Sequence, residues 1–190
     1  QASRAAQPPR CRRRCAMAGS RLCVLLRHGT PVPEEEDPAR PLSEQGREEA
    51  GHTAKGVAEY LAEGGGAGLK PGGVLVAHSG KARARQTAEA VAAALAGAGW
   101  EPQCEQRDGL SPNDDPQAAA ELVSQAETEA VVLVGHLPHM GKLAAALAQS
   151  PAAAGRLGGQ FHPAGGLLLR RESADGPWQE SKVVATDAEW

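Results

Sequence analysis

Short apolar runs and longer helical segments alternate along most of this chain. The apolar runs predict buried strands at residues 21–26, 74–77 and 130–135 and, with a weaker signal, at 101–106. Alanine-rich or periodically apolar segments predict helices at 43–63, 79–95, 117–126 and 141–149. Ser43 is placed to cap the first helix, and the GGGAG segment at 64–68 is placed to end it. This alternation favours a parallel sheet covered by helices on both faces.

The pattern changes after residue 150. Segments 161–172 and 178–185 have the composition of strands, with a polar ADGP turn and no helix between them. Such a pair is expected to be antiparallel and to lie at an edge of the sheet. We therefore predict one domain over residues 21–190, an α/β fold built as a three-layer α/β/α sandwich whose mostly parallel sheet has an antiparallel edge.

Composition and charge exclude several function classes. The chain of 190 residues is 41% hydrophobic and 23% charged, which is ordinary for a single globular domain. Its net charge of −3 gives no strong field toward nucleic acid or anionic lipid, so neither is expected as a partner. No apolar run approaches the roughly 20 residues that cross a bilayer.

The N-terminal segment is excluded from the predicted domain. Residues 1–20 are rich in arginine and contain no acidic residue, a composition typical of an organelle transit peptide. A plastid or mitochondrial location would follow. Alternatively, Met17 is the natural start and the location is cytoplasmic; both interpretations stay open. The four cysteines form no CxxC pair and are expected to be free thiols.

Polar residues follow three of the predicted strands. Because the carboxyl ends of parallel strands meet at one edge of a sheet, these residues are expected to converge on one crevice. They are Arg27, His28 and Gly29 after the first strand, Ser79 and Arg83 after the second, and Gly135 and His136 after the fourth.

The combination of arginine and histidine indicates phosphate chemistry. A guanidinium matches phosphate oxygens in pairs, and a helix N-terminus adds backbone donors. A neutral imidazole can attack phosphorus, and arginine charge would keep His28 neutral. A hydrogen bond from one ring nitrogen to the backbone would fix the tautomer. An RHG tripeptide alone is a weak signal, so the prediction depends on the joint pattern of the strand ends.

Four segments carry a resemblance to a known family. In order they are LLRHGTPVPEEEDPARPLSEQGREEA, HSGKARARQTAEAVA, GLSPNDD and VLVGHLPHMGKLA, spanning roughly residues 22–148. They resemble the histidine phosphatase superfamily, with its phosphoglycerate mutase-like fold, and within it the short SixA-type phosphohistidine phosphatases. The resemblance implies an enzyme that needs no metal or other cofactor and forms a phosphohistidine intermediate.

The resemblance also implies roles for individual residues. His28 matches the nucleophile, Arg27 and Arg83 match the phosphate-binding arginines, and His136 matches the second catalytic histidine. Gly29 and Ser79 are further candidates for substrate binding, and Arg85 is expected on the surface. A phosphate or sulfate anion is the expected occupant of the pocket.

The proton donor is not apparent in the sequence. The acid phosphatase branch places an acid directly after the second histidine, where this chain has Leu137. Asp114 and Asp115 follow the third strand and are candidates, with capping of the next helix as the alternative. A weak acid matters less for a P–N bond, whose leaving nitrogen can already be protonated.

The expected function is hydrolysis of phosphohistidine on another protein by a monomeric enzyme. The alternative is a small-molecule phosphomonoester phosphatase or mutase of the same superfamily, and a third is a phosphate-binding module without activity. Among the other histidines, His52 is expected on the surface and His78 in a structural role. His139 lacks the third partner of a metal site and is expected at the pocket rim or in solvent.

Overall fold

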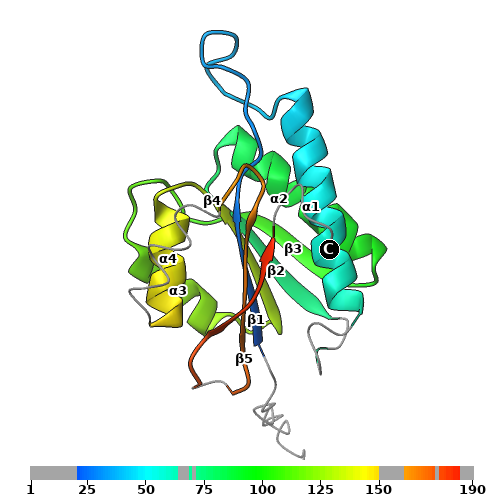
Figure 1. Cartoon of the computed structure of the whole chain (residues 1–190), viewed down its shortest axis with the longest axis vertical. Coiled ribbons are helices and arrows are strands. Elements are labelled where there is room, and N and C mark those ends of the chain that lie inside the picture. The colour runs from blue at the N-terminus through cyan, green and yellow to red at the C-terminus, as the bar shows by residue number, and fades with distance from the viewer. Residues whose placement is uncertain (1–20, 64–68, 70–71, 150–160, 174–175, 185–190) are drawn as a thin grey trace, which may run out of the picture.

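The computed structural model contains one six-stranded mixed sheet and four helices (Figure 1). It describes residues 21–63, 69, 72–149, 161–173 and 176–184. The strands are β1 (Arg21–Arg27), β2 (Gly73–His78), β3 (Glu101–Gln106), β4 (Ala130–Gly135), β5 (Gly166–Arg171) and β6 (Gln179–Val184). The helices are α1 (Glu44–Ala62), α2 (Ala82–Gly97), α3 (Pro116–Gln125) and α4 (His139–Ala148).

The strand order in the sheet is β3-β2-β4-β1-β5-β6. The first four strands in this order are parallel, and β5 pairs antiparallel with both β1 and β6. The antiparallel edge therefore follows the parallel part, as the sequence predicts. The central strands β1 and β4 pair with each other in parallel. Their register places Arg27 opposite Gly135.

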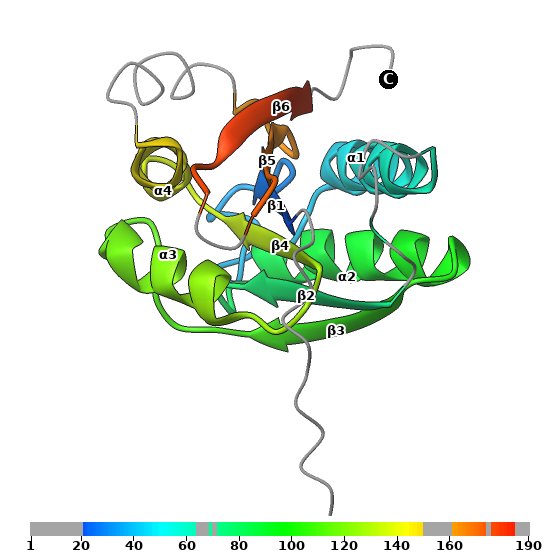
Figure 2. The ribbon, with the colours of Figure 1, turned by 90° about the horizontal axis from the view of Figure 1, so that it is seen from below.

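Helices cover both faces of the sheet, α1 and α2 on one and α3 and α4 on the other (Figure 2). Successive side chains of a strand point to opposite faces. Val24 and Leu26 thus join the core beneath α1 and α2, while Cys23 and Leu25 join the core beneath α3 and α4. All four side chains are buried, because helices on both sides exclude water from β1.

The start of α1 is fixed against the loop that follows β1. The Ser43 hydroxyl accepts a hydrogen bond from the Gly46 amide at 3.0 Å, which caps the helix. A Cβ on Gly46 would lie 1.9 Å from the Thr30 carbonyl oxygen, so only glycine fits. This close approach of two backbones joins α1 to the segment that contains His28.

The predicted elements are confirmed with small changes of boundary. Helix α2 begins at Ala82, after the loop that contains Ser79, and α4 begins at His139 instead of Gly141. Residues 1–20 and the GGGAG segment lie outside the described residues. No helix within the described ranges is long and apolar enough to span a membrane.

Candidate active site

The carboxyl ends of the central strands bring the two predicted catalytic histidines together. The His28 amide donates to the Gly135 carbonyl oxygen at 3.1 Å, which continues the pairing of β1 with β4. The ring centroids of His28 and His136 lie 4.8 Å apart, and the ring planes are tilted by 58°. Both side chains are buried. The two histidines therefore share one site.

The hydrogen bonds of His28 fix the position of its ring proton. Nδ1 lies 2.7 Å from the Gly29 carbonyl oxygen, which can only accept, so Nδ1 carries the hydrogen. Nε2 of the neutral ring is then bare, and it accepts a hydrogen bond from Nε of Arg83 at 3.1 Å. The lone pair of His28 thus points to the place where Arg83 would hold an anion.

His28 is neutral at pH 7. Burial is the main cause of a pKa that is lowered to about 4. The hydrogen bond to Gly29 opposes this shift, and the charges of Arg83, Arg27 and Arg40 add to it. The sequence predicts the neutrality from arginine charge, whereas in the structure the loss of solvent is the larger cause.

His136 lies beside Ser79, at the end of β2. The Ser79 hydroxyl and Nε2 of His136 are 2.7 Å apart and share a hydrogen bond. Burial, followed by the charges of His28 and Arg83, lowers the pKa of His136 to about 3. A bound dianion would offset the positive charge of Arg83 and raise the pKa of His136, which would let both ring nitrogens donate.

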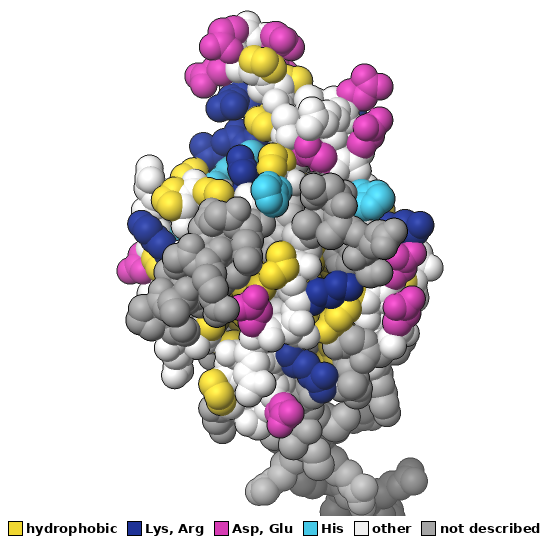
Figure 3. Space-filling view, viewed as in Figure 1, with side chains coloured by type: hydrophobic (Ala, Val, Ile, Leu, Met, Phe, Trp, Pro, Cys, Tyr) yellow, Lys and Arg dark blue, Asp and Glu magenta, His cyan; other side chains and the backbone are white. Residues whose placement is uncertain are grey.

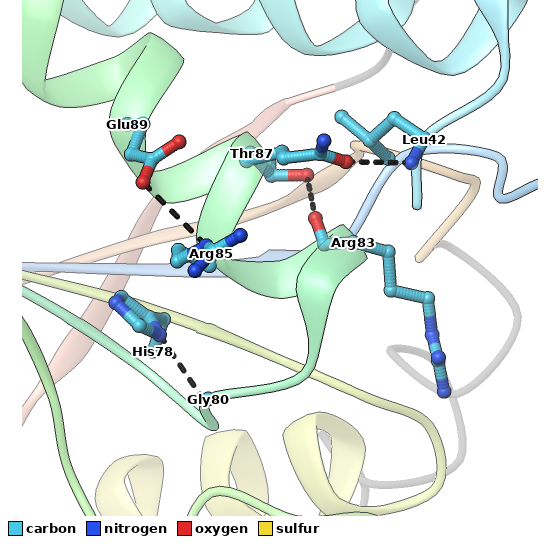
Figure 4. A network of polar contacts seen from close by, with 8 residues as sticks. Leu42, His78, Gly80, Arg83, Arg85, Thr87 and Glu89 are labelled. Atoms are coloured by element: carbon cyan, nitrogen blue, oxygen red, sulfur yellow. Dashed lines mark hydrogen bonds and ion pairs between the residues drawn. The ribbon is translucent and has the colours of Figure 1, made fainter. Parts of the chain in front are cut away.

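The first two turns of α2 hold Arg83 and the loop after β1 together (Figure 4). The Thr87 hydroxyl donates to the Arg83 carbonyl oxygen at 2.8 Å and accepts from the Gly29 amide at 3.1 Å. Gln86, between them, accepts from the Leu42 amide at 2.7 Å. The Gly29 amide is therefore already bonded within the protein.

Arg27 is held by a backbone carbonyl group, and a nearby carboxylate partly offsets its positive charge. Its Nη1 donates to the Phe161 carbonyl oxygen at 3.0 Å. Burial lowers the pKa of Arg27, and the charge of Glu49 opposes this shift. Glu49, on α1, also accepts from the amide and the hydroxyl of Thr30, at 2.8 and 2.9 Å. Helix α1 thus supplies a negative charge at the rim of an otherwise cationic site.

The two candidate proton donors are engaged in local backbone hydrogen bonds. The Asp114 carboxylate accepts from the Ser111 amide at 2.8 Å, and the Asp115 carboxylate caps α3 by accepting from the Gln117 amide at 2.9 Å. The geometry of Asp115 matches the capping alternative, whereas Asp114 closes a turn within the loop before α3. No side-chain hydrogen bond joins a carboxylate to His28 or His136 among the described residues.

Solved structures with the same fold include several phosphatases. SixA of Agrobacterium tumefaciens, to which phosphohistidine phosphatase activity is ascribed, is 26% identical over 87% of this chain and 97% of its own, with a TM-score of 0.65. The protein histidine phosphatase SixA, complexed with tungstate, is 21% identical over 87% and 97%, with a TM-score of 0.64. A mycobacterial glucosyl-3-phosphoglycerate phosphatase complexed with VO3 is 19% identical over 87% and 99%, with a TM-score of 0.61.

These solved structures are histidine phosphatases and related proteins, and this chain shares their phosphoglycerate mutase-like fold. The neighbours indicate a phosphatase, which is a hydrolase. No protein-family model and no curated protein matches the sequence.

Several residues of this candidate site were not singled out from the sequence. They are Arg40, Glu49, Gln86 and Thr87. Thr87 is a fully buried polar residue four positions after Arg83, so helical spacing places both on one face. That spacing was a usable signal. The contacts of Arg40 and Glu49 depend on how the segment between β1 and α1 folds back, which no local pattern specifies.

The predictions for His52, His78 and Arg85 are confirmed, and the prediction for His139 is wrong. His52 is exposed, as is Arg85, which pairs with Glu89 at 3.6 Å. His78 is buried and accepts from the Gly80 amide at 3.1 Å, a structural role (Figure 4). The prediction for His139 is wrong, because its side chain is completely buried at the start of α4.

Packing within the protein leaves no room for a side chain at Gly29 or Gly135. A Cβ on Gly29 would lie 2.5 Å from the Gly46 carbonyl oxygen, and one on Gly135 would lie 2.6 Å from the Met140 methyl group. In the sequence analysis, Gly29 is a candidate for substrate binding and Gly135 is placed at the end of the fourth strand. In the structure, each makes room for a neighbouring element of the protein itself.

Proposed function

We propose that this chain is a phosphatase that transfers the phosphoryl group of phosphohistidine on another protein to His28 and then to water. The bare Nε2 beside Arg83 is the observation that carries the proposal. An imidazole that is neutral, oriented by its own backbone and bordered by guanidinium groups is suited to attack a phosphorus atom held by those groups.

The reaction takes place in two transfers. The lone pair on His28 Nε2 forms a bond to phosphorus while the bond from phosphorus to the substrate nitrogen breaks, and the departing imidazole keeps that electron pair. Water then attacks the phosphorus, the bond to Nε2 breaks, and orthophosphate leaves with neutral His28 restored. Arg27, Arg83 and His136 stabilise the negative charge on the phosphoryl oxygens in both transfers.

Phosphohistidine is favoured because neither active-site histidine bonds to a carboxylate among the described residues. An alkoxide leaving from a phosphomonoester needs a proton from an acid, whereas an imidazole can be protonated before it leaves. The carboxylates nearest in sequence to the expected position, Asp114 and Asp115, accept backbone hydrogen bonds instead.

The test compares a phosphohistidine peptide with small phosphomonoesters. We expect kcat/KM for the peptide to exceed that for the esters, and expect His28→Ala to abolish the activity. His52→Ala is the matched control, because His52 is exposed on α1. Faster hydrolysis of the monoesters would instead favour the small-molecule phosphatase, the activity of one of the structural neighbours.

A further inference from the structure

Residues 31–42 form an arm between β1 and α1 that extends beyond the end of the sheet (Figure 1). The two ends of the arm are joined by an antiparallel bridge between Pro31 and Leu42 and by a hydrogen bond from the Val32 amide to the Pro41 carbonyl oxygen at 2.8 Å. The Leu42 amide also donates to Gln86 on α2. The base of the arm is therefore held beside the turn that carries Arg83.

Arg40 lies two residues before this attachment. Its φ angle is 48°, in the left-handed region that residues with a Cβ rarely adopt, and its amide donates to the Asp37 carbonyl oxygen at 2.9 Å. This turn separates an acidic tip, made of Glu34, Glu35, Glu36 and Asp37, from the base of the arm. Figure 3 shows acidic side chains at that end of the molecule, with basic (Lys or Arg) and histidine side chains below them.

The guanidinium of Arg40 has a buried donor without an acceptor. Its Nε is inaccessible to solvent and has no hydrogen-bond partner within the described part of the chain. The Glu34 carboxylate is 4.0 Å from Nη1, too far for a hydrogen bond, and the Glu34 side chain is 72% exposed. The charge of Arg40 also acts on both His28 and Arg83, lowering the pKa of each.

We propose that Arg40 is a third arginine of the anion site, which donates to the phosphoryl group held by His28 and Arg83. This inference rests on the proposed function. Arg27 has one nitrogen bonded to Phe161, and Arg83 contacts the nucleophile itself. Arg40 approaches from the arm and completes the set of donors, while Glu34 competes with the anion for its charge.

Orthovanadate binding to the full chain tests this role without any substrate. We expect Arg40→Ala to weaken binding by about 10- to 100-fold, the effect of losing one charged hydrogen bond. Arg40→Lys should recover part of the loss. Arg85→Ala is the matched control, since that exposed arginine pairs with Glu89, and its affinity should equal that of the wild type.

Glu34→Gln gives a second readout with the opposite sign. Removing the competing carboxylate should tighten vanadate binding, and this gain should vanish when Arg40 is also alanine. Unchanged affinity in Arg40→Ala, or an equal gain with and without Arg40, would overturn the role of Arg40 alone. Failure of the wild type to bind vanadate would overturn the proposed phosphatase site as well.

Discussion

The histidines after β1 and β4 and the aspartates after β3 follow parallel strands at one edge of the sheet, but they are bonded differently. Nε2 of His28 bonds to a side chain 55 positions away, and that of His136 bonds to one 57 positions away. The carboxylates of Asp114 and Asp115 bond to backbone three and two positions away.

This difference separates two uses of a polar residue at a strand end. A carboxylate bonded to backbone two or three positions away stabilises the loop that carries it, and its hydrogen-bonding capacity is partly used there. A ring nitrogen bonded across the fold depends on several elements being in place, and it stabilises no local structure. The long-range bonds therefore mark the residues that we expect to be essential for turnover.

The strongest test of this contrast is His28→Ala. Without the nucleophile we expect turnover to fall by at least about 10⁴-fold, in the range found for nucleophiles in other enzymes. Brief exposure to a radiolabelled phosphohistidine peptide should give an acid-labile phosphoprotein with the wild type and none with the variant. Labelling that persists in His28→Ala would assign the nucleophile to another residue.

Arg83→Ala removes the donor of the long-range hydrogen bond to His28. We expect kcat/KM to fall by about 10²- to 10³-fold, because one preorganised donor to the phosphoryl oxygens is lost. Arg85→Ala, two residues along the same helix, should retain wild-type kinetics. Equal losses in the two variants would indicate that α2 is merely perturbed and that Arg83 has no particular role.

Acidification should lower the stability of the fold, because two buried histidines are neutral in the folded protein. Folding lowers the pKa values of His28 and His136 to about 4 and about 3. Below about pH 6.5 the unfolded chain therefore binds protons that the folded chain does not, and this difference lasts until the pH reaches the pKa of each histidine in the folded protein. Stability therefore falls with pH through this window. Each histidine should remove about 2 kcal/mol from the free energy of unfolding between pH 7 and pH 5.

Urea unfolding at the two pH values measures this loss. In His28→Asn and in His136→Asn, the free energy of unfolding should fall less between pH 7 and pH 5 than it does in the wild type. The reduction should equal the contribution of the substituted histidine. The His52→Asn variant is the control, as this side chain is exposed. An unchanged pH dependence in both active-site variants would mean that their rings are solvated and titrate as in the unfolded chain.

The smallest effects are expected at the aspartates. Asparagine caps a helix about as well as aspartate, which applies to Asp115, and its side-chain oxygen can accept the same loop hydrogen bond at position 114, but it cannot act as an acid. Asp114→Asn and Asp115→Asn should therefore change kcat on phosphohistidine by less than about threefold and leave the thermal midpoint near that of the wild type. A tenfold loss of kcat in either variant, with folding intact, would make that residue the proton donor.

The sequence was sufficient to predict the strand and helix order, because the apolar runs of β1, β2 and β4 are bounded by clear loop residues. It also placed His28, Arg83 and His136 on one edge, because the ends of parallel strands must meet there. The roles of these residues and of Arg27 stay predictions until the variants are measured.

Long-range contacts were the part that could not be predicted. His139 is completely buried although it lies in a polar loop segment, since the loop after β3 covers the start of α4. Glu49 and Arg40 reach the site only because Thr30 and Leu42, at the two ends of the connection between β1 and α1, are held by α1 and α2. The sequence pattern describes which face of an element is apolar, but it does not describe how a long connection returns.

The contact between Gly46 and Thr30 has a consequence for how the site can move. The two backbones touch so closely that a single methyl group would overlap the Thr30 carbonyl oxygen. We therefore expect the loop carrying the nucleophile to move only together with the first turn of α1. The tip of the arm lies outside this contact, so substitutions there can probe the substrate range of the proposed reaction without disturbing it.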